Sequence, residues 1–370
     1  MSEWPPIDFG HTGYDAAFRR GDVYAVAADP VRARKRPLAI GIAGAGGVAQ
    51  AKWIPAIRRL QTMGEPISIV GVADPREDLV TKAAMLAGAA AYASAAALLG
   101  QARPDLLLVL TADAAHAPVA NEAISRGIAC LVEKPLSPNF AEAAELVHYA
   151  KARNVLLAAV ANKRFSPPYA LAKELIARRT LHGAPTVFTG KFTLGYPYVD
   201  ILAGGTVHLL DLMLWLMGPV ARLHARGIYR DGRGGGGLAS AVVSFAFLSG
   251  AIGTIMTSAA ALSFKPWERV EIIGRNAFLV VDDQIETILF DDETGPAKSW
   301  RPTVPNTLMF DEVFGGYCGL LDNVLDALRG LVPLDATGAD GAAAVGLIEA
   351  IRRSLDDGAE IDIASEGLVP

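Results

Sequence analysis

The segment AIGIAGAGGVAQ, residues 39–50, passes from a short apolar run through three glycines to the start of a helix-like stretch. Two needs place residues without side chains at such a junction: a tight strand-to-helix turn, and close approach of a phosphate to the main chain. In the spacing G-x-G-x-x-[G/A], Gly44 permits the turn, Gly46 clears the approach and Ala49 allows close helix–strand packing. The residues predicted to hold the pyrophosphate of a dinucleotide are Gly44, Gly46, Gly47, Val48 and Ala49.

Composition limits the class of protein. The chain has 370 residues, of which 52% are hydrophobic and 20% charged, with a formal net charge of −5. This length exceeds what one hydrophobic core usually supports, so two domains are expected. A negative net charge without a long basic run argues against a nucleic-acid partner. Two cysteines, Cys130 and Cys318, are too few for a disulfide framework and suit a reducing compartment.

The sequence also argues against a membrane partner. No stretch reaches the ~18–20 uninterrupted apolar residues that a spanning helix needs. The first residues, with Trp4, Pro5 and Asp8, do not form the apolar core of a signal peptide. We therefore expect a cytoplasmic protein.

From residue 38 onward, short apolar runs alternate with stretches of helical periodicity. Strands are predicted at 38–44, 67–74, 106–111, 129–134 and 155–160, and helices at 48–60, 77–88, 116–126 and 142–153. Apolar strands alternating with helices are typical of βαβ units and of a parallel sheet buried on both faces. With right-handed crossovers, the region is predicted to be an α/β domain with a doubly wound, Rossmann-type sheet.

Beyond Asn162 the pattern changes to consecutive strands joined by Gly- and Asp-rich turns. Strands are predicted at 186–195, 222–230, 240–247, 250–258, 269–273, 278–281 and 286–290, and helices at 168–179, 208–216, 316–330 and 338–357. Consecutive strands predict a large, open and mostly antiparallel sheet in an α+β domain. The expected organisation is an N-terminal extension (1–37), a dinucleotide-binding domain (38–161), a substrate and oligomerisation domain (162–335), and a C-terminal helix and tail (336–370). The basic run 31–37 is interpreted as a solvated linker.

An acidic residue, Asp74, ends the second predicted strand. A carboxylate there accepts hydrogen bonds from the adenosine ribose and repels a 2′-phosphate, which favours NAD over NADP. It lies farther from the first glycine than the usual ~20 residues, a difference that an insert around 61–66 absorbs. Arg76 is suited to hold a 2′-phosphate, so NADP stays open, as does a plain turn aspartate before Pro75.

The tripeptide Glu133-Lys134-Pro135 follows a predicted strand, at the edge where open α/β sheets bind their ligands. A partly desolvated lysine beside the cationic ring of an oxidised nicotinamide gives up its proton more readily. Pro135 stiffens the turn. Judged by residue type alone, a lone lysine at a strand end is more often a surface residue.

Together these features resemble the glucose–fructose oxidoreductase / inositol dehydrogenase / rhizopine catabolism (Gfo/Idh/MocA) family of NAD(P)-dependent oxidoreductases. The resemblance runs from about residue 38 to about residue 358. Its motifs are the glycine turn, TADAAH at 111–116, Glu133-Lys134-Pro135, NKRF at 162–165, His208-x-x-Asp211 and a closing segment at 337–354. It implies hydride transfer between NAD or NADP and a hydroxyl-bearing carbon of a sugar, cyclitol or related polyol. A homodimer or homotetramer is implied as well.

The resemblance also implies residue roles. Lys134 would contact the reacting hydroxyl, His208 would donate or accept the proton, and Asp211 would bind substrate hydroxyls. The remaining implied contacts are Thr111, His116 and Glu133 beside the cofactor, and Arg164 facing cofactor and substrate. Without the resemblance, His208 on its apolar helix reads as a core residue and His116 as a helix cap.

One position departs from the family pattern. Many members that oxidise sugars or cyclitols carry an aspartate four residues before the histidine, where this chain has Gly204. Asp200 or Tyr198 is then a candidate for the same space, or Lys134 and His208 suffice.

The sequence is also compatible with two other functions. Some relatives use tightly held NAD for transient oxidation during glycoside cleavage or epimerisation. A non-catalytic, nucleotide-dependent sensor is favoured by Gly204 and opposed by the retained Lys134 and His208. The histidines show no metal-ligand spacing with carboxylates or cysteines, so no metal is expected. A serine hydrolase is disfavoured because the chain has no G-x-S-x-G motif.

Overall fold

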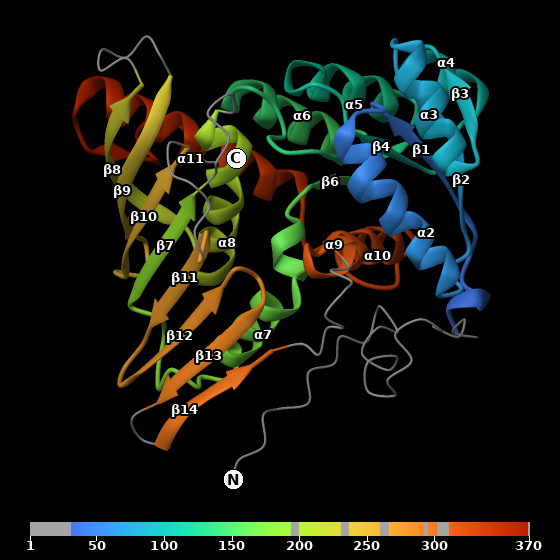
Figure 1. Ribbon diagram of the computed structural model, residues 1–370. Coiled ribbons are helices and arrows are strands. Elements are labelled where there is room, and N and C mark those ends of the chain that lie inside the picture. The colour runs from blue at the N-terminus through green and yellow to red at the C-terminus, as the bar shows by residue number, and fades with distance from the viewer. Residues whose placement is uncertain are drawn as a thin grey trace. The chain divides into compact units, whose positions relative to one another are not determined.

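A computed structural model describes residues 31–193, 200–230, 237–259, 266–291, 295–301 and 311–368 (Figure 1). The chain forms two compact units, each made of three segments. The first unit comprises Met1–Glu133, His148–Pro167 and Thr303–Thr337, and the second Lys134–Val147, Pro168–Pro302 and Gly338–Pro370. The main chain first passes from one unit to the other at the Glu133–Lys134 peptide bond.

The first unit is built on a parallel sheet of six strands in the order β3-β2-β1-β4-β5-β6. The strands are β1 Leu38–Ala43, β2 Ile67–Ala73, β3 Ala90–Tyr92, β4 Leu106–Val109, β5 Ala129–Val132 and β6 Leu157–Ala159. Every residue of β4 and β5 is buried, as expected for strands covered on both faces. Because strand order reverses between β1 and β4, the unit has a topological switch point there. The predicted Rossmann-type sheet is confirmed.

The helices of this part of the chain are α2 Ile54–Thr62, α3 Glu77–Ala87, α4 Ala95–Gln101 and α5 His116–Ser125, and α6 Phe140–Ala152 is shared between the two units. Periodicity predicted all of these helices except α4. Strand β3 and helix α4 had no predicted counterpart. Their segment, AAAYASAAALLG at 89–100, is almost uniformly small and apolar, so neither the strand nor the helix period stands out.

A distant part of the chain completes the core of this unit. Helix α10, Tyr317–Leu328, follows the short helix α9, Asp311–Phe314. Its buried side chains share one hydrophobic cluster with α2 and with alternate residues of β1 and β4. The cluster members from α10 are Cys318, Leu320, Leu321, Val324 and Leu325.

The basic segment before β1 was expected to be solvated throughout, and for Arg32 and Lys35 that expectation was wrong. Arg32 is 4% exposed and donates to both oxygens of Asp322 on α10, at 2.8 and 2.6 Å, and to Glu65 at 3.0 Å. Lys35, three residues on, binds Asp326 at 2.8 Å. Desolvation outweighs the arginine and raises the pKa of Asp322 to about 6. Buried carboxylates need such cations, so the pairs fix this segment to the core.

The second unit contains a nine-stranded sheet in the order β14-β13-β12-β11-β7-β10-β9-β8-β15. Its strands are β7 Val187–Thr193, β8 Val220–Tyr229, β9 Leu238–Phe247, β10 Ile252–Ser258, β11 Glu268–Ile273, β12 Ala277–Asp282, β13 Glu286–Asp291, β14 Gly295–Trp300 and β15 Ile361–Asp362. Only the β7–β10 pair is parallel among the pairs described, which confirms the mostly antiparallel sheet.

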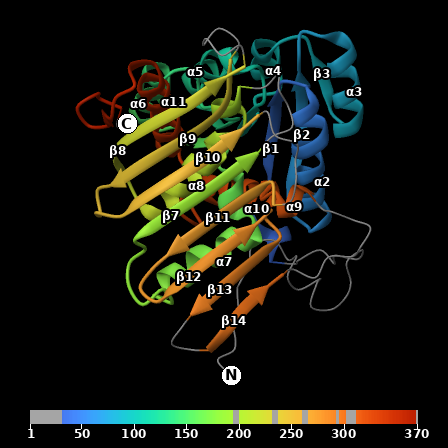
Figure 2. The same ribbon diagram turned by 60° about the vertical axis from the view of Figure 1, so that its left-hand side comes forward.

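Helices α7 Pro167–Ala177, α8 Val207–Met217 and α11 Gly338–Asp357 lie along one face of this sheet (Figures 1 and 2). The opposite face carries exposed side chains. Met256 on β10 lies opposite Val242 on β9, and these apolar residues are 37% and 51% exposed. Among the described helices, none is both long and apolar enough to cross a bilayer.

Candidate functional site

The glycine turn at the end of β1 has both properties that the sequence suggested. Gly44 has φ +101°, and its N–H donates to the Ala73 carbonyl at 2.8 Å. A Cβ on Gly44 would lie 2.3 Å from the Leu110 carbonyl oxygen, so a side chain is excluded there. A Cβ on Gly46 or Gly47 would instead meet no protein atom within 4 Å. The turn is therefore tight at its first glycine and open at the next two, which fits a phosphate approaching the backbone.

The helix after the turn opens with a π-helical turn, η2 Ala49–Trp53, and continues as α2. A single α-helix was predicted here, and a π-helical turn is a frequent feature of functional sites. Ala49 is buried, as its packing role requires, whereas Val48 is 43% exposed at the mouth of the turn. Gln50 closes the turn by donating from Nε2 to the Ala45 carbonyl at 2.8 Å.

Asp74 lies directly after β2 and supports the glycine turn. Its Oδ2 accepts from the Ala45 N–H at 2.9 Å, and its Oδ1 accepts from the N–H and Nε of Arg76 at 2.9 and 3.2 Å. Burial alone would raise the pKa of Asp74, but these hydrogen bonds and the Arg76 charge outweigh it and hold the pKa below its ordinary value. The carboxylate is thus charged at neutral pH, and the more exposed Arg76 side chain is held against it.

The TADAAH segment follows β4, next to the glycine turn. His116 is the first residue of α5 and is buried, with its Nε2 at 3.1 Å from the Thr111 carbonyl oxygen. The histidine thus closes the loop that begins at Thr111.

Glu133, at the end of β5, is buried beside the helix that begins at the glycine turn. Its Oε1 accepts from Trp53 Nε1 at 3.0 Å, and Trp53 packs edge-on against Tyr317 with ring centroids 5.1 Å apart. Desolvation, with the Glu133 charge, raises the pKa of Tyr317. Trp53 could not be recognised from the sequence, because an indole in an apolar helix is typical of a core residue.

Arg164 lies in a 3-10 turn, η4 Asn162–Phe165, within the first unit. It is buried, and its NH1 donates to the Asp335 carbonyl at 2.7 Å. Asn162 likewise donates to the Gly315 carbonyl at 2.6 Å. The NKRF segment therefore ties β6 to the chain around α10.

Lys134 begins the second unit, where its Nζ donates to the Gly204 carbonyl oxygen at 2.9 Å. The peptide bond to Pro135 is cis. Gly204 lies in a second π-helical turn, η5 Leu202–Thr206, which runs directly into α8. At the position where the family resemblance led us to look for an aspartate, the main chain itself supplies an acceptor for the lysine.

His208 and Asp211 lie on α8, three residues apart and therefore on one helix face. His208 is half-buried and Asp211 is buried. The start of α8 is anchored by the Thr206 hydroxyl, which donates to the Ile201 carbonyl and lies 2.8 Å from the Thr257 hydroxyl.

Of the two residues considered in place of the family aspartate, the structure describes Asp200. Asp200 caps the η5 turn: its Oδ1 accepts from the N–H groups of Leu202 and Ala203 at 2.9 and 3.3 Å. Its Oδ2 accepts from NH2 of Arg352 on α11 at 2.7 Å. Tyr198 lies outside the described residues.

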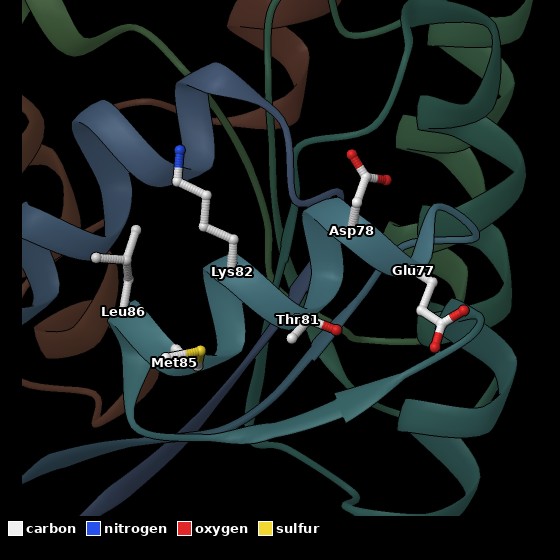
Figure 3. A pocket seen from close by; sticks show the side chains of 6 residues that line it. All are labelled: Glu77, Asp78, Thr81, Lys82, Met85 and Leu86. Carbon is white, nitrogen blue, oxygen red and sulfur yellow. The ribbon is translucent and has the colours of Figure 1, made fainter.

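Two other features do not compete with this site. A hollow of about 710 Å³ on α3 is lined by Glu77, Asp78, Thr81, Lys82, Met85 and Leu86 (Figure 3). All its side chains come from one helix, so it lacks the convergent polar groups of a binding pocket.

The described residues also bring three carboxylates within 4.8 Å, from Glu65, Asp322 and Asp326. Arg32 and Lys35 already bind these acids, so the cluster is an ion-pair network.

Comparison with protein-family models gives two matches. A model described as "Oxidoreductase family, NAD-binding Rossmann fold" matches residues 38–161. A model described as "GFO/IDH/MocA C-terminal domain" matches residues 170–280. Together they cover more than half of the chain.

Among curated proteins, the putative oxidoreductase YceM of Salmonella typhimurium is 30% identical over 193 residues, 51% of this chain and 59% of that protein. The match thus spans about three fifths of YceM. Myo-inositol 2-dehydrogenase of Thermotoga maritima is 26% identical over 305 residues, 78% of this chain and 89% of that protein.

Solved structures share the fold. An oxidoreductase from Agrobacterium radiobacter, in complex with NAD⁺, L-tartaric acid and magnesium, has a TM-score of 0.80 at 18% identity and covers 90% of this chain and 100% of its own. A levoglucosan dehydrogenase in complex with NADH has a TM-score of 0.80 at 16% identity, covering 89% and 99%. GenD2 from gentamicin A biosynthesis, in complex with NAD, has a TM-score of 0.74 at 24% identity, covering 88% and 96%.

Proposed function

The chain belongs to the Gfo/Idh/MocA family of NAD-binding oxidoreductases, and from this premise we propose that it is an NAD-dependent dehydrogenase of a sugar, cyclitol or related polyol. The observation that carries the proposal is the hydrogen bond from Lys134 Nζ to the Gly204 carbonyl. It fixes the ammonium on the turn that leads into the helix with His208. The names of the inositol and levoglucosan dehydrogenases among its relatives support this substrate class.

The first unit provides the residues for the dinucleotide. The glycine turn at 44–49 would bind the pyrophosphate through main-chain N–H groups, and Asp74 would face the adenosine ribose. Bound NAD supplies the hydride chemistry. Because Asp74 stays charged at neutral pH, it would repel a 2′-phosphate, and we propose NAD rather than NADP. His116, Thr111 and Glu133 would serve the nicotinamide side.

The second unit provides the groups for proton transfer. As a neutral amine, Lys134 would accept the hydroxyl proton while the carbon that bears this hydroxyl gives up a hydride, and as an ammonium it would return the proton in reduction. His208 would assist as proton donor or acceptor, and Asp211 would accept hydrogen bonds from neighbouring hydroxyls. A positioned acid–base group contributes about 10²–10⁴-fold to the rate. Holding both reactants at contact distance supplies much of the remainder.

The test combines a substrate screen with a lysine variant. Purified protein is mixed with sugars, cyclitols, sugar acids and glycosides plus NAD⁺ or NADP⁺, and reduced nicotinamide is followed. Lys134→Met should lower turnover about 10²–10⁴-fold while NAD binding by calorimetry is retained. The matched control is Lys191→Met, because Lys191 also donates to a main-chain carbonyl, that of Pro266 at 2.8 Å.

Each alternative function predicts a different result of this test. Sugar released from a glycoside without net NADH would indicate transient oxidation instead of net dehydrogenation. NAD binding without turnover on any substrate would indicate a sensor. Full activity of the Lys134→Met variant would refute the role proposed for the lysine.

We also propose that the protein is a homodimer or homotetramer that pairs through the face of the nine-stranded sheet opposite helices α7, α8 and α11. The exposed pair Val242 and Met256 lies at neighbouring positions of that face. Apolar side chains in register on adjacent strands are suited to packing against a second copy.

A further inference from the structure

A chain of hydrogen bonds connects helix α11 with the Lys134 ammonium, entirely within the second unit. Arg352 on α11 donates from NH2 to Oδ2 of Asp200 at 2.7 Å. The Asp200 Oδ1 accepts from the N–H groups at positions 202 and 203, and its main-chain carbonyl accepts from the Gly204 N–H at 2.7 Å. One residue thus holds three consecutive N–H groups, and the last belongs to the residue whose carbonyl accepts from Lys134.

At the start of this turn the side chains of Ile201 and Leu202 are buried, and the bonds from Asp200 fix the main chain that follows them. The turn is π-helical with the sequence LAGGT, and the two adjacent glycines have no side chains to pack. Its second half is anchored through the Thr206 hydroxyl. The direction of the Gly204 carbonyl therefore depends on how firmly Asp200 caps the start of the turn.

Arg352 holds the oxygen of the Asp200 carboxylate that the turn does not use. The Asp200 and Arg352 side chains are 51% and 43% exposed, and both line an open pocket of about 340 Å³. An exposed carboxylate changes rotamer readily unless a partner holds it, and a charge-assisted bond from a guanidinium is directional. Such an exposed pair adds little to global stability. Its effect should therefore be on local geometry.

We propose that Arg352 is a positioning residue, which acts through Asp200 and the 202–206 turn to hold the Gly204 carbonyl against Lys134. The inference rests on the proposed function for its catalytic consequence only. It also changes the role of Asp200 from a substrate ligand to the cap of this turn.

The test compares two neighbouring arginines of α11. Arg353 is 39% exposed and binds Glu349 at 2.6 Å and also Glu366, so Arg353→Gln removes two surface ion pairs of the same helix. We expect Arg352→Gln to lower kcat about tenfold, with KM, NAD binding and melting temperature nearly unchanged, because small misplacements of a catalytic group cost rate rather than binding. Arg352→Lys should recover most of the loss. Arg353→Gln should stay within about twofold of the parent.

A second readout does not need activity. Hydrogen exchange measured by mass spectrometry on a peptide spanning 201–206 should be about tenfold faster in Arg352→Gln and unchanged in Arg353→Gln, because the cap protects those amides. Unchanged exchange, unchanged kcat, or equal losses in both variants would overturn the inference. If the parent protein oxidises no polyol, the proposed function fails, and exchange alone then decides whether Arg352 holds the turn.

Discussion

Alanine at Gly44 and at Gly46 should separate the mechanical need for glycine from the chemical one. At Gly44 the new Cβ would lie 2.3 Å from the Leu110 carbonyl oxygen, at a φ of +101° that L-residues avoid. A left-handed backbone costs about 1–2 kcal/mol and overpacking about 1–3 kcal/mol, so we expect Gly44→Ala to lose about 3 kcal/mol of unfolding free energy. At Gly46 the Cβ meets no protein atom within 4 Å, so stability should stay within about 0.5 kcal/mol.

For NAD affinity, the larger effect is expected at Gly46, the position where stability should hardly change. A methyl group at Gly46 would occupy the path that we propose for the pyrophosphate toward the main chain. Losing one hydrogen bond to a charged group costs about 1.5–3 kcal/mol, so the Kd for NAD should rise about 10–100-fold. Urea unfolding and calorimetry with NAD measure the two effects. A Gly46→Ala protein that binds NAD as the parent does, or a Gly44→Ala protein of full stability, would refute this reading of the turn.

Three further variants and one control test the charge and surface assignments. Asp74→Asn should reduce the free energy of unfolding at pH 7, as measured by urea titration. Because folding lowers the pKa of Asp74, the difference between variant and parent should shrink and then vanish when the titration is repeated at pH values below about 4. Arg32→Met should lower the free energy of unfolding in urea by about 3–5 kcal/mol at pH 7, and by less below about pH 6, where Asp322 is protonated. The control Arg34→Met, at an exposed neighbour, should lower it by under about 0.5 kcal/mol. Val242→Glu should halve the mass found by light scattering, from dimer to monomer or from tetramer to dimer; an unchanged oligomer would exclude this face as the interface.

Much of the architecture could be predicted from the sequence because local patterns determine it. The run LLLV at 106–109 is apolar at every position, which fits a strand covered on both faces. The glycine spacing and the strand before it predicted the tight turn that the structure shows after β1. Periodicity shows which face of α10 is apolar, but not which sheet that face packs against. Its packing in the core of the first unit therefore could not be predicted.

The buried ion pairs could not be predicted from the sequence for a related reason. A basic run is usually solvated, and the acids that bind Arg32 lie far away in the chain, at Glu65 and Asp322. The Trp53–Glu133 bond likewise joins residues from different elements. Long-range partners of this kind come from the fold, and local pattern does not report them.

The Gly204 carbonyl bears on the choice between an enzyme and a sensor. Position-by-position comparison with a family examines side chains, so glycine in place of an aspartate suggests a lost function. Every residue has a main-chain acceptor, however, and a π-helical turn directs this one at Lys134 at 2.9 Å. A carbonyl orients the ammonium as a carboxylate would, without adding negative charge. The absent side chain therefore no longer argues against catalysis. The choice between an enzyme and a sensor depends on whether Lys134→Met abolishes turnover.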